Sequence, residues 1–188
     1  MRTALFGGTF DPIHRAHLTV AAEAAKRFSL DRVLFIPAGN PPHKNTGTSY
    51  PDRFKMVELA CAADPRFVAS RLEEGRAKSY SIDTIERVLH ENLAEPPLFF
   101  IIGADAFEEI ASWHRWQDVI ASVEFVVVAR PGHVIAAPGG ARVHCLETLA
   151  LPVSSSEIRR MLARGESTEE IPATVAAYIR ERGLYRSA

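Results

Sequence analysis

The sequence predicts an α/β fold in which a mainly parallel sheet carries helices on both faces. Three observations support this prediction. Short apolar segments alternate with helical segments along most of the 188 residues. The apolar segments are nearly continuous, as in strands that are buried on both faces. Glycine and proline bound the strongest of them. We therefore expect a doubly wound, Rossmann-like sheet in one domain over residues 1–188. A chain of this length is long enough for one domain with a sizeable core and too short to require two.

The predicted strands are the short apolar segments. The first, Thr3 to Phe6, precedes a pair of glycines. The strongest is PLFFIIGAD, which is bounded by Pro97 and Gly103. In chain order, the predicted strands span residues 3–6, 32–39, 66–70, 97–105, 124–132 and 141–147.

The predicted helices rest on apolar residues that recur at helical spacing. In the first of them, Leu18, Ala21, Ala25 and Phe28 share one face. Ser81 is the expected N-cap of the third, because its hydroxyl can accept a backbone N–H bond. In chain order, the predicted helices span 16–28, 52–63, 81–93, 105–111, 113–122, 155–164 and 172–181, and the Pro-rich stretch 40–51 is a loop.

Ligands of such sheets bind beyond the carboxyl ends of the strands. This rule selects the polar and glycine-containing segments that follow predicted strands. They are GGTFDPIH at 7–14, PAGNPPHK at 37–44, GADAF at 103–107 and ARPG at 129–132.

Composition excludes several classes of protein. Hydrophobic residues make up 47% of the chain, charged residues 24%, and the formal net charge is -1. The chain has no basic surface of the kind that nucleic acids require. Neither a signal peptide nor an apolar run of ~20 residues is present, so we expect a cytoplasmic protein with no membrane partner. Cys61 and Cys145 form no CxxC pair and are expected to be reduced.

The first strand-to-helix connection has the residues of a phosphate site. Gly7 and Gly8 allow a tight turn and a close approach to a ligand. The N–H groups at the start of the following helix carry partial positive charge, which suits phosphate. His14 and His17 are three residues apart, so both imidazoles would lie on one face of that helix start. Thr9 adds a hydroxyl donor.

Other interpretations of this connection remain open. It can be a simple turn in which Pro12 starts the helix and the histidines pack or face solvent. His-x-x-His can bind a metal, but no third ligand is evident in the sequence. The segment is neither a Walker loop nor a dinucleotide fingerprint, because G-x-x-x-x-G-K-[ST] and G-x-G-x-x-G are both absent.

Two segments resemble motifs of the nucleotidyltransferases that share the H-x-G-H signature. GGTFDPIHRAH at 7–17 resembles their first motif, and VSSSEIRRML at 153–162 resembles the second, which usually reads I-S-S-T-x-I-R. Within this superfamily the chain resembles the bacterial nicotinate-nucleotide adenylyltransferase family, up to about residue 185. The intervening segments that agree are PPHK at 41–44, SYSIDT at 79–84, IIGADAF at 101–107, SWHRW at 112–116 and VVARPG at 127–132.

Three positions depart from the family pattern. Ala16 replaces the usual glycine of H-x-G-H and narrows the approach to the nucleotide. Ser156 and Ser81 each replace a usual threonine and keep the hydroxyl. None of the three removes a functional group.

The resemblance implies transfer of AMP from ATP to nicotinate mononucleotide, giving nicotinate adenine dinucleotide and pyrophosphate in NAD biosynthesis. The attacking phosphate is already an anion, so catalysis needs positioning and charge stabilisation rather than a general base. Mg²⁺ would arrive with ATP, without a metal site of the protein's own. The implied catalytic residues are His14, His17, Lys44 and Arg159, with His17 stabilising charge at the reacting phosphorus.

The resemblance also implies two sets of binding residues. Trp113 would stack on the nicotinate ring, and Asp105 would bind a ribose hydroxyl. The ATP set is Gly7, Gly8, Thr9, Phe10, His14, His17, Ser154, Ser155, Ser156 and Arg159, and the mononucleotide set is Lys44, Tyr80, Thr84, Gly103, Asp105, Trp113 and Arg130.

The sequence leaves several alternatives open. The acceptor can be phosphopantetheine or nicotinamide mononucleotide, and a flavodoxin-like nucleotide-binding module is the non-catalytic alternative. Trp113 can be a core residue, Asp105 a helix N-cap and Lys44 a solvated loop residue. The oligomeric state, a homo-oligomer included, and a lid function for loop 40–50 are not determined.

Overall fold

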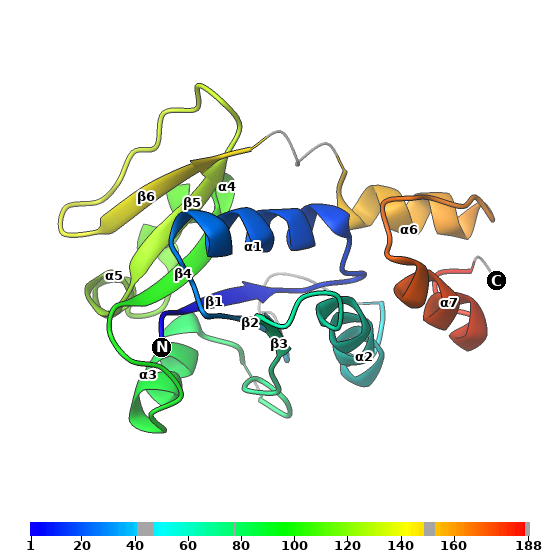
Figure 1. Ribbon diagram of the computed structural model, residues 1–188, viewed down its shortest axis with the longest axis horizontal. Coiled ribbons are helices and arrows are strands. Elements are labelled where there is room, and N and C mark those ends of the chain that lie inside the picture. Colours follow the sequence, from blue (N-terminus) through cyan, green and yellow to red (C-terminus); the bar gives the residue numbers. More distant parts are fainter. Residues whose placement is uncertain (41–46, 77, 149–152, 187–188) are drawn as a thin grey trace.

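The structure is a computed structural model that describes residues 1–40, 47–76, 78–148 and 153–186 (Figure 1). Its centre is a six-stranded sheet in the order β3-β2-β1-β4-β5-β6. Every pair of neighbouring strands is parallel. This is the strand order of doubly wound nucleotide-binding folds, so the predicted fold class is confirmed. The strands are β1 Thr3–Gly8, β2 Arg32–Pro37, β3 Phe67–Ala69, β4 Leu98–Gly103, β5 Glu124–Ala129 and β6 Arg142–Glu147.

Alternate residues of the strands supply two separate cores, one on each face of the sheet. In β1, Ala4 and Phe6 belong to one cluster, whereas Leu5 belongs to the other. In β2, Phe35 and Leu34 divide in the same way. Because both faces are buried, the strands read as continuous apolar runs in the sequence.

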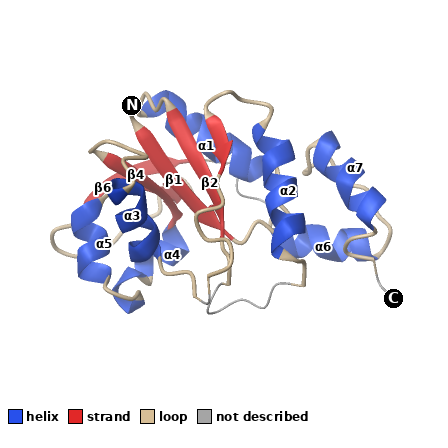
Figure 2. Cartoon of the chain, turned by 90° about the horizontal axis from the view of Figure 1, so that it is seen from below, coloured by secondary structure: helices blue, strands red, loops and turns tan. Residues whose placement is uncertain are grey.

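Helices cover both faces, as predicted. The core that contains Phe6 also contains apolar residues of α1, α2, α6 and α7, and the core that contains Leu5 contains those of α3, α4 and α5. Figure 2 shows α3, α4 and α5 on one side of the strands and α2, α6 and α7 on the other. The helices are α1 Arg15–Arg27, α2 Tyr50–Cys61, α3 Ser81–His90, α4 Ala104–Glu108, α5 Trp116–Ser122, α6 Ser155–Ala163 and α7 Ala173–Arg182, with a short 3₁₀ turn, η1, at Ile110–Ser112.

Several predicted boundaries are wrong by a few residues. Ser81 is the first residue of α3, and the N-cap is Tyr80, whose extended backbone precedes the helix. The helix expected from residue 113 begins at Trp116, because Arg115 has a left-handed backbone (φ 52°) that interrupts helical geometry. Pro12 does not start a helix, since α1 begins at Arg15.

The sheet order places a crevice at the ends of β1 and β4. From β1 the chain winds outward through β2 to β3, and then returns to the other side of β1 to form β4. The connections that follow β1 and β4 therefore run in opposite directions, which opens space between them. Figure 1 places α6 and α7 beside the end of β1 where α1 begins. Among the described residues, no helix combines the length and apolar character needed to cross a bilayer.

Candidate active site

A cavity of about 640 Å³ lies at the carboxyl ends of β1, β4 and β5. It brings together the two sequence motifs, which are about 140 residues apart in the chain. From the predicted ATP set it contains all members except Gly7, which is exposed at the end of β1. Its lining residues are Phe6, Gly8, Thr9, Phe10, Asp11, His14, Ala16, His17, Val20, Gly103, Val128, Val153, Ser154, Ser155, Ser156 and Arg159.

The two histidines are held together at the start of α1. His14 is the N-cap residue, and its backbone N–H donates to Nδ1 of His17, 3.2 Å away. The two ring centroids are 3.8 Å apart, and the ring of Phe10 meets that of His17 edge-on at 5.1 Å. The first turn of α1 contains no acidic residue. The positive end of the helix dipole is therefore not compensated from within that turn, which favours an anionic ligand.

His14 is buried, with 5% of its surface exposed, and Nδ1 of its ring has no hydrogen-bond partner. Burial lowers the pKa of His14 from 6.5 to about 4, because the apolar surroundings penalise the charged form. His14 is therefore a neutral imidazole at physiological pH, which offers one donor and one acceptor rather than a positive charge.

We expect His14 to make the folded state less stable in acid. Between pH 6.5 and 4 the unfolded chain binds a proton that the folded chain does not, so stability falls as the pH falls through this window. A shift from 6.5 to about 4 corresponds to a loss of about 3 kcal/mol, at about 1.4 kcal/mol per pKa unit. Urea unfolding of the wild type and of His14→Gln at pH 7, 5.5 and 4.5 measures this term. A decline of equal slope in both proteins would contradict it.

The second motif contacts the backbone of the first directly. Nη1 of Arg159 donates to the carbonyl oxygen of Asp11 at 2.6 Å, and the hydroxyl of Ser155 donates to that of Pro12 at 3.0 Å. Ser154 caps α6, since its Oγ accepts from the N–H of Glu157 at 3.2 Å. The N-termini of α1 and α6 are thus both directed to one cavity, and each supplies backbone N–H groups there.

A second cavity of about 440 Å³ adjoins the first and shares Gly103 and Val128 with it. Two further residues of the predicted mononucleotide set, Asp105 and Arg130, line this cavity. The interpretation of Asp105 as a helix N-cap is wrong, because Gly103 is the N-cap of α4 and Asp105 lies in its first turn.

The remaining described residues of the mononucleotide set line neither cavity. Trp113 is half-buried, with its ring edge-on to Phe100 at 6.2 Å. The ring of Tyr80 contacts that of His114 in a tilted arrangement, with ring centroids 4.5 Å apart. Thr84 is 3% exposed, so its side chain supports this region from within.

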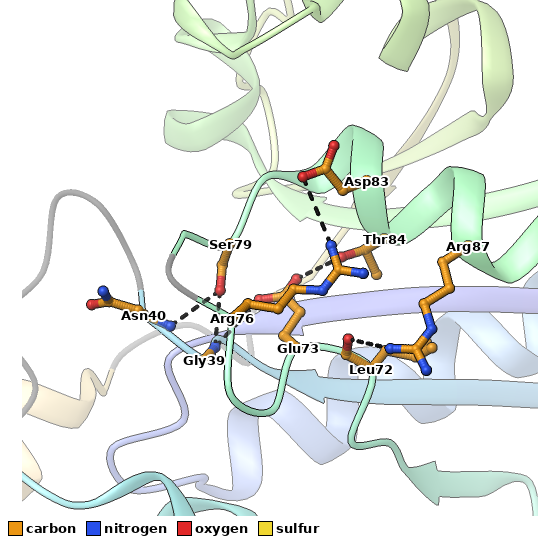
Figure 3. A network of polar contacts seen from close by, with 9 residues as sticks. All are labelled: Gly39, Asn40, Leu72, Glu73, Arg76, Ser79, Asp83, Thr84 and Arg87. Atoms are coloured by element: carbon orange, nitrogen blue, oxygen red, sulfur yellow. Dashed lines mark hydrogen bonds and ion pairs between the residues drawn. The ribbon is translucent and has the colours of Figure 1, made fainter.

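Figure 3 shows the hydrogen bonds that connect Ser79, at the start of the segment 79–84, to the residues that follow β2. The backbone N–H groups of Gly39 and Asn40 both donate to Oγ of Ser79, at 3.0 and 3.1 Å. The hydroxyl of Thr84 donates to Glu73 at 2.9 Å. The structure therefore joins two of the predicted ligand-binding segments, 37–40 and 79–84. Lys44 lies outside the described residues.

Sequence reasoning missed three polar residues in or beside the first motif, two of them buried and one half-buried. They are Asp11, Arg53 and Tyr185. Arg53 donates to the carbonyl oxygen of Thr9, and Tyr185 donates to the carboxylate of Asp11. The carbonyl oxygen of Asp11 accepts from Arg159. Arg53 sits among apolar residues of α2, where a helix-period pattern would have placed it on the buried face. Asp11 and Tyr185 carry no comparable signal, because their contact spans most of the chain.

The polar groups of the main cavity suit a magnesium ion that stays on phosphate oxygens. Among the described lining residues Asp11 is the carboxylate, and its Oδ1 accepts the hydroxyl of Tyr185 at 2.6 Å. Hydroxyls, imidazoles and a guanidinium make up most of the other polar side chains, and these are phosphate ligands rather than a magnesium cage. In the described part of the chain, no three His, Cys, Asp or Glu side chains are grouped to hold a metal.

The chain is similar to known proteins over most of its length. Residues 5–161 match the family model described as cytidylyltransferase-like. A probable nicotinate-nucleotide adenylyltransferase of Solibacter usitatus is 56% identical, over 98% of this chain and 100% of that protein. Another, from Pelobacter propionicus, is 42% identical over 98% of each chain.

Solved structures share the fold at low sequence identity. The Plasmodium falciparum nicotinic acid mononucleotide adenylyltransferase complexed with NaAD has a TM-score of 0.79 and 19% identity, and the match covers 98% of this chain and 97% of that one. A putative nicotinate-nucleotide adenylyltransferase from Vibrio parahaemolyticus has a TM-score of 0.73 and 20% identity, over 100% and 98% of the two chains.

Proposed function

This chain belongs to the nicotinate-nucleotide adenylyltransferase family of cytidylyltransferase-like proteins, and on that premise we propose that it transfers AMP from ATP to nicotinate mononucleotide. The products are nicotinate adenine dinucleotide and pyrophosphate. One observation carries the proposal: a single cavity is lined by both the histidine pair and the Ser154–Arg159 motif. A binding module would need one phosphate cradle, whereas phosphoryl transfer needs groups on both sides of the reacting phosphorus.

In the proposed reaction, an oxygen of the mononucleotide phosphate attacks the α-phosphorus of ATP. The bond between the α-phosphorus and the oxygen that bridges to the β-phosphorus breaks, and pyrophosphate leaves with that electron pair. The attacking oxygen carries no proton, so no residue has to remove one. The protein's part is to hold the two phosphates in line and to stabilise the charge that develops.

We assign His17 and the N–H groups at the start of α1 to the α-phosphate. The neutral imidazole of His14 donates to a neighbouring phosphate oxygen without adding charge. The N-terminus of α6, with Ser155 and Ser156, takes the β- and γ-phosphates, and Arg159 neutralises them from the side. Magnesium bound to ATP supplies a further counter-charge to the leaving pyrophosphate. Lys44 remains a predicted phosphate ligand.

We assign a ribose of the substrates to the adjoining cavity. Asp105 is exposed there and can accept a ribose hydroxyl, and Arg130 adds positive charge. Trp113 and Tyr80 remain the predicted contacts of the pyridine ring. We assign Thr84 a supporting role inside the protein, because its buried hydroxyl donates to Glu73.

We also propose that residues 1–188 act as one nucleotidyltransferase domain. Ile158 of α6 and Val175 of α7 pack into the same core as β1, which supports this view. The cytoplasmic location expected from the sequence remains a prediction.

Pyrophosphate release from ATP tests the proposal. The purified chain would receive ATP and magnesium with nicotinate mononucleotide, nicotinamide mononucleotide or phosphopantetheine in parallel, and the products would be identified by mass. We expect the acid mononucleotide to be preferred. Preference for phosphopantetheine would keep the phosphate site and reject the pyridine contacts. ATP binding with no turnover on any acceptor would instead favour the non-catalytic module.

A further inference from the structure

Arg53 of α2 is the most unusual buried side chain near the main cavity. It is 1% exposed, although arginine is seldom buried without a partner. Its guanidinium donates to three backbone carbonyls: Nη1 to Thr9 at 2.8 Å, Nη2 to Ala38 at 2.8 Å and Nε to Thr48 at 3.4 Å. One planar group thus joins the loop after β1, the loop after β2 and the segment before α2.

The contact with Thr9 completes a pattern along the first motif. The carbonyl oxygen of Gly8 accepts from the N–H of Ala38 at 2.9 Å, and those of Asp11 and Pro12 accept from Arg159 and Ser155. A loop that binds phosphate must present N–H groups and keep its carbonyl oxygens away from the anion. Hydrogen bonds from other segments hold four carbonyls of residues 8–12 in place, and Arg53 supplies one of these bonds.

Asp11 provides a counter-charge to the buried Arg53, and Tyr185 holds the Asp11 carboxylate. Asp11 is 4% exposed and interacts electrostatically with the guanidinium. The hydroxyl of Tyr185 donates to Asp11 at 2.6 Å, and burial together with this bond raises the pKa of Tyr185. Tyr185 has φ of 61°, a backbone conformation that costs a residue with a side chain about 1–2 kcal/mol. The chain thus adopts an unfavourable conformation where the hydroxyl reaches Asp11.

Arg53 is not among the residues that line the cavity, so it has no route to the nucleotide itself. Asp11 does line the cavity, and its backbone follows Thr9 and Phe10 and leads to the histidines. A shift of this loop would move His14 and His17 relative to the reacting phosphorus. Misplacement by about 1 Å can cost about 100-fold in rate.

We propose that Arg53, with Asp11 as its counter-charge and Tyr185 holding Asp11, is a positioning residue that sets the phosphate-binding loop and thereby directs His14 and His17. The inference rests on the proposed adenylyl transfer and adds a residue to it that does not touch either substrate. It predicts that the shape of the guanidinium matters as well as its charge, because an ammonium group cannot span three carbonyls in one plane.

The first test is Arg53→Lys, with Arg66→Lys as the matched control, since Arg66 pairs with Asp64 away from the cavity. We expect kcat of Arg53→Lys to fall about 10- to 100-fold, with KM for nicotinate mononucleotide changed less than about threefold and the melting curve still cooperative. Amide exchange of residues 9–14 should become faster. Wild-type kcat and unchanged exchange in this loop would overturn the inference.

Two further variants keep the test decisive if Arg53→Lys folds poorly. In Arg53→Ala, guanidinium ion at low millimolar concentration should restore part of kcat. An inert salt at the same concentration should not restore it.

Tyr185→Phe removes one hydroxyl, and we expect a roughly tenfold lower kcat with faster amide exchange at Asp11. Wild-type exchange and rate in Tyr185→Phe would reject the assembly. Absence of turnover in the wild type would reject the proposed function alone, because the exchange measurements do not need it.

Discussion

Replacing His17 by alanine is expected to lower turnover about 100-fold or more while the protein still folds. His17 lines the main cavity, and its Nδ1 accepts the backbone N–H of His14. In the neutral ring the proton therefore sits on Nε2, which makes that nitrogen a donor. Removing one donor to a transition-state oxyanion typically costs about 2.7–4 kcal/mol of barrier, and about 1.4 kcal/mol corresponds to tenfold in rate.

Steady-state kinetics and thermal unfolding of the same preparation check this result. Loss of the His14–His17 capping bond should lower stability by about 1 kcal/mol, far too little to unfold the protein. His90→Ala is the matched control, because His90 is exposed at the end of α3 and distant in sequence from both motifs. A folded His17→Ala enzyme with wild-type turnover would remove His17 from the mechanism.

Gly39→Ala should be among the most destabilising single substitutions in the described chain. A Cβ on Gly39 would lie 2.0 Å from the carbonyl oxygen of Glu73, and this neighbour is backbone rather than a movable side-chain end. One of the two segments must shift, which breaks the bonds from Gly39 and Asn40 to Ser79. Overpacking of this kind costs about 3 kcal/mol, or roughly 6–12 °C in melting temperature for a chain of this size.

Gly139→Ala is the control for that experiment. A Cβ at Gly139 meets no heavy atom within 4 Å, and its φ is not in the left-handed region. We expect the free energy of unfolding of Gly139→Ala to differ from that of the wild type by less than about 0.5 kcal/mol. Equal melting temperatures for Gly39→Ala and the wild type would show that the Gly39–Glu73 contact can relax without cost.

The sheet and the phosphate cavity could be predicted because their signals are local. Continuous apolar runs such as 98–103 mark buried strands, and the rule for carboxyl ends then selects the segments between them. That rule selects the segment of His14, and the family resemblance adds the second motif. The structure places His14, His17, Ser154, Ser155, Ser156 and Arg159 around one cavity. Boundaries such as that at Tyr80 depend on backbone angles that Ser81 and its neighbours do not determine by themselves.

The supporting residues could not be predicted, because their partners are backbone atoms or distant side chains. The helical period places Arg53 on the buried face of α2, but the backbone carbonyls that it binds have no side-chain signature in the sequence. The hydrogen bond from Thr84 to Glu73 likewise has no signature in the sequence. Such contacts arise only when the sheet has brought separate loops together.

The long sequence separation between Asp11 and its partners has a consequence for the order in which the protein folds. Arg159 reaches the Asp11 carbonyl across 148 positions, and Tyr185 reaches its carboxylate across 174. During folding β1 can pair with β2, and β2 with β3, at an early stage, whereas Arg159 and Tyr185 reach the first motif from much later in the sequence. Loops of this length form late, because their entropy is lost before any contact compensates it. The contacts that join the first motif to Arg159 and Tyr185 therefore form after the strands have paired, so the candidate site is completed late in folding.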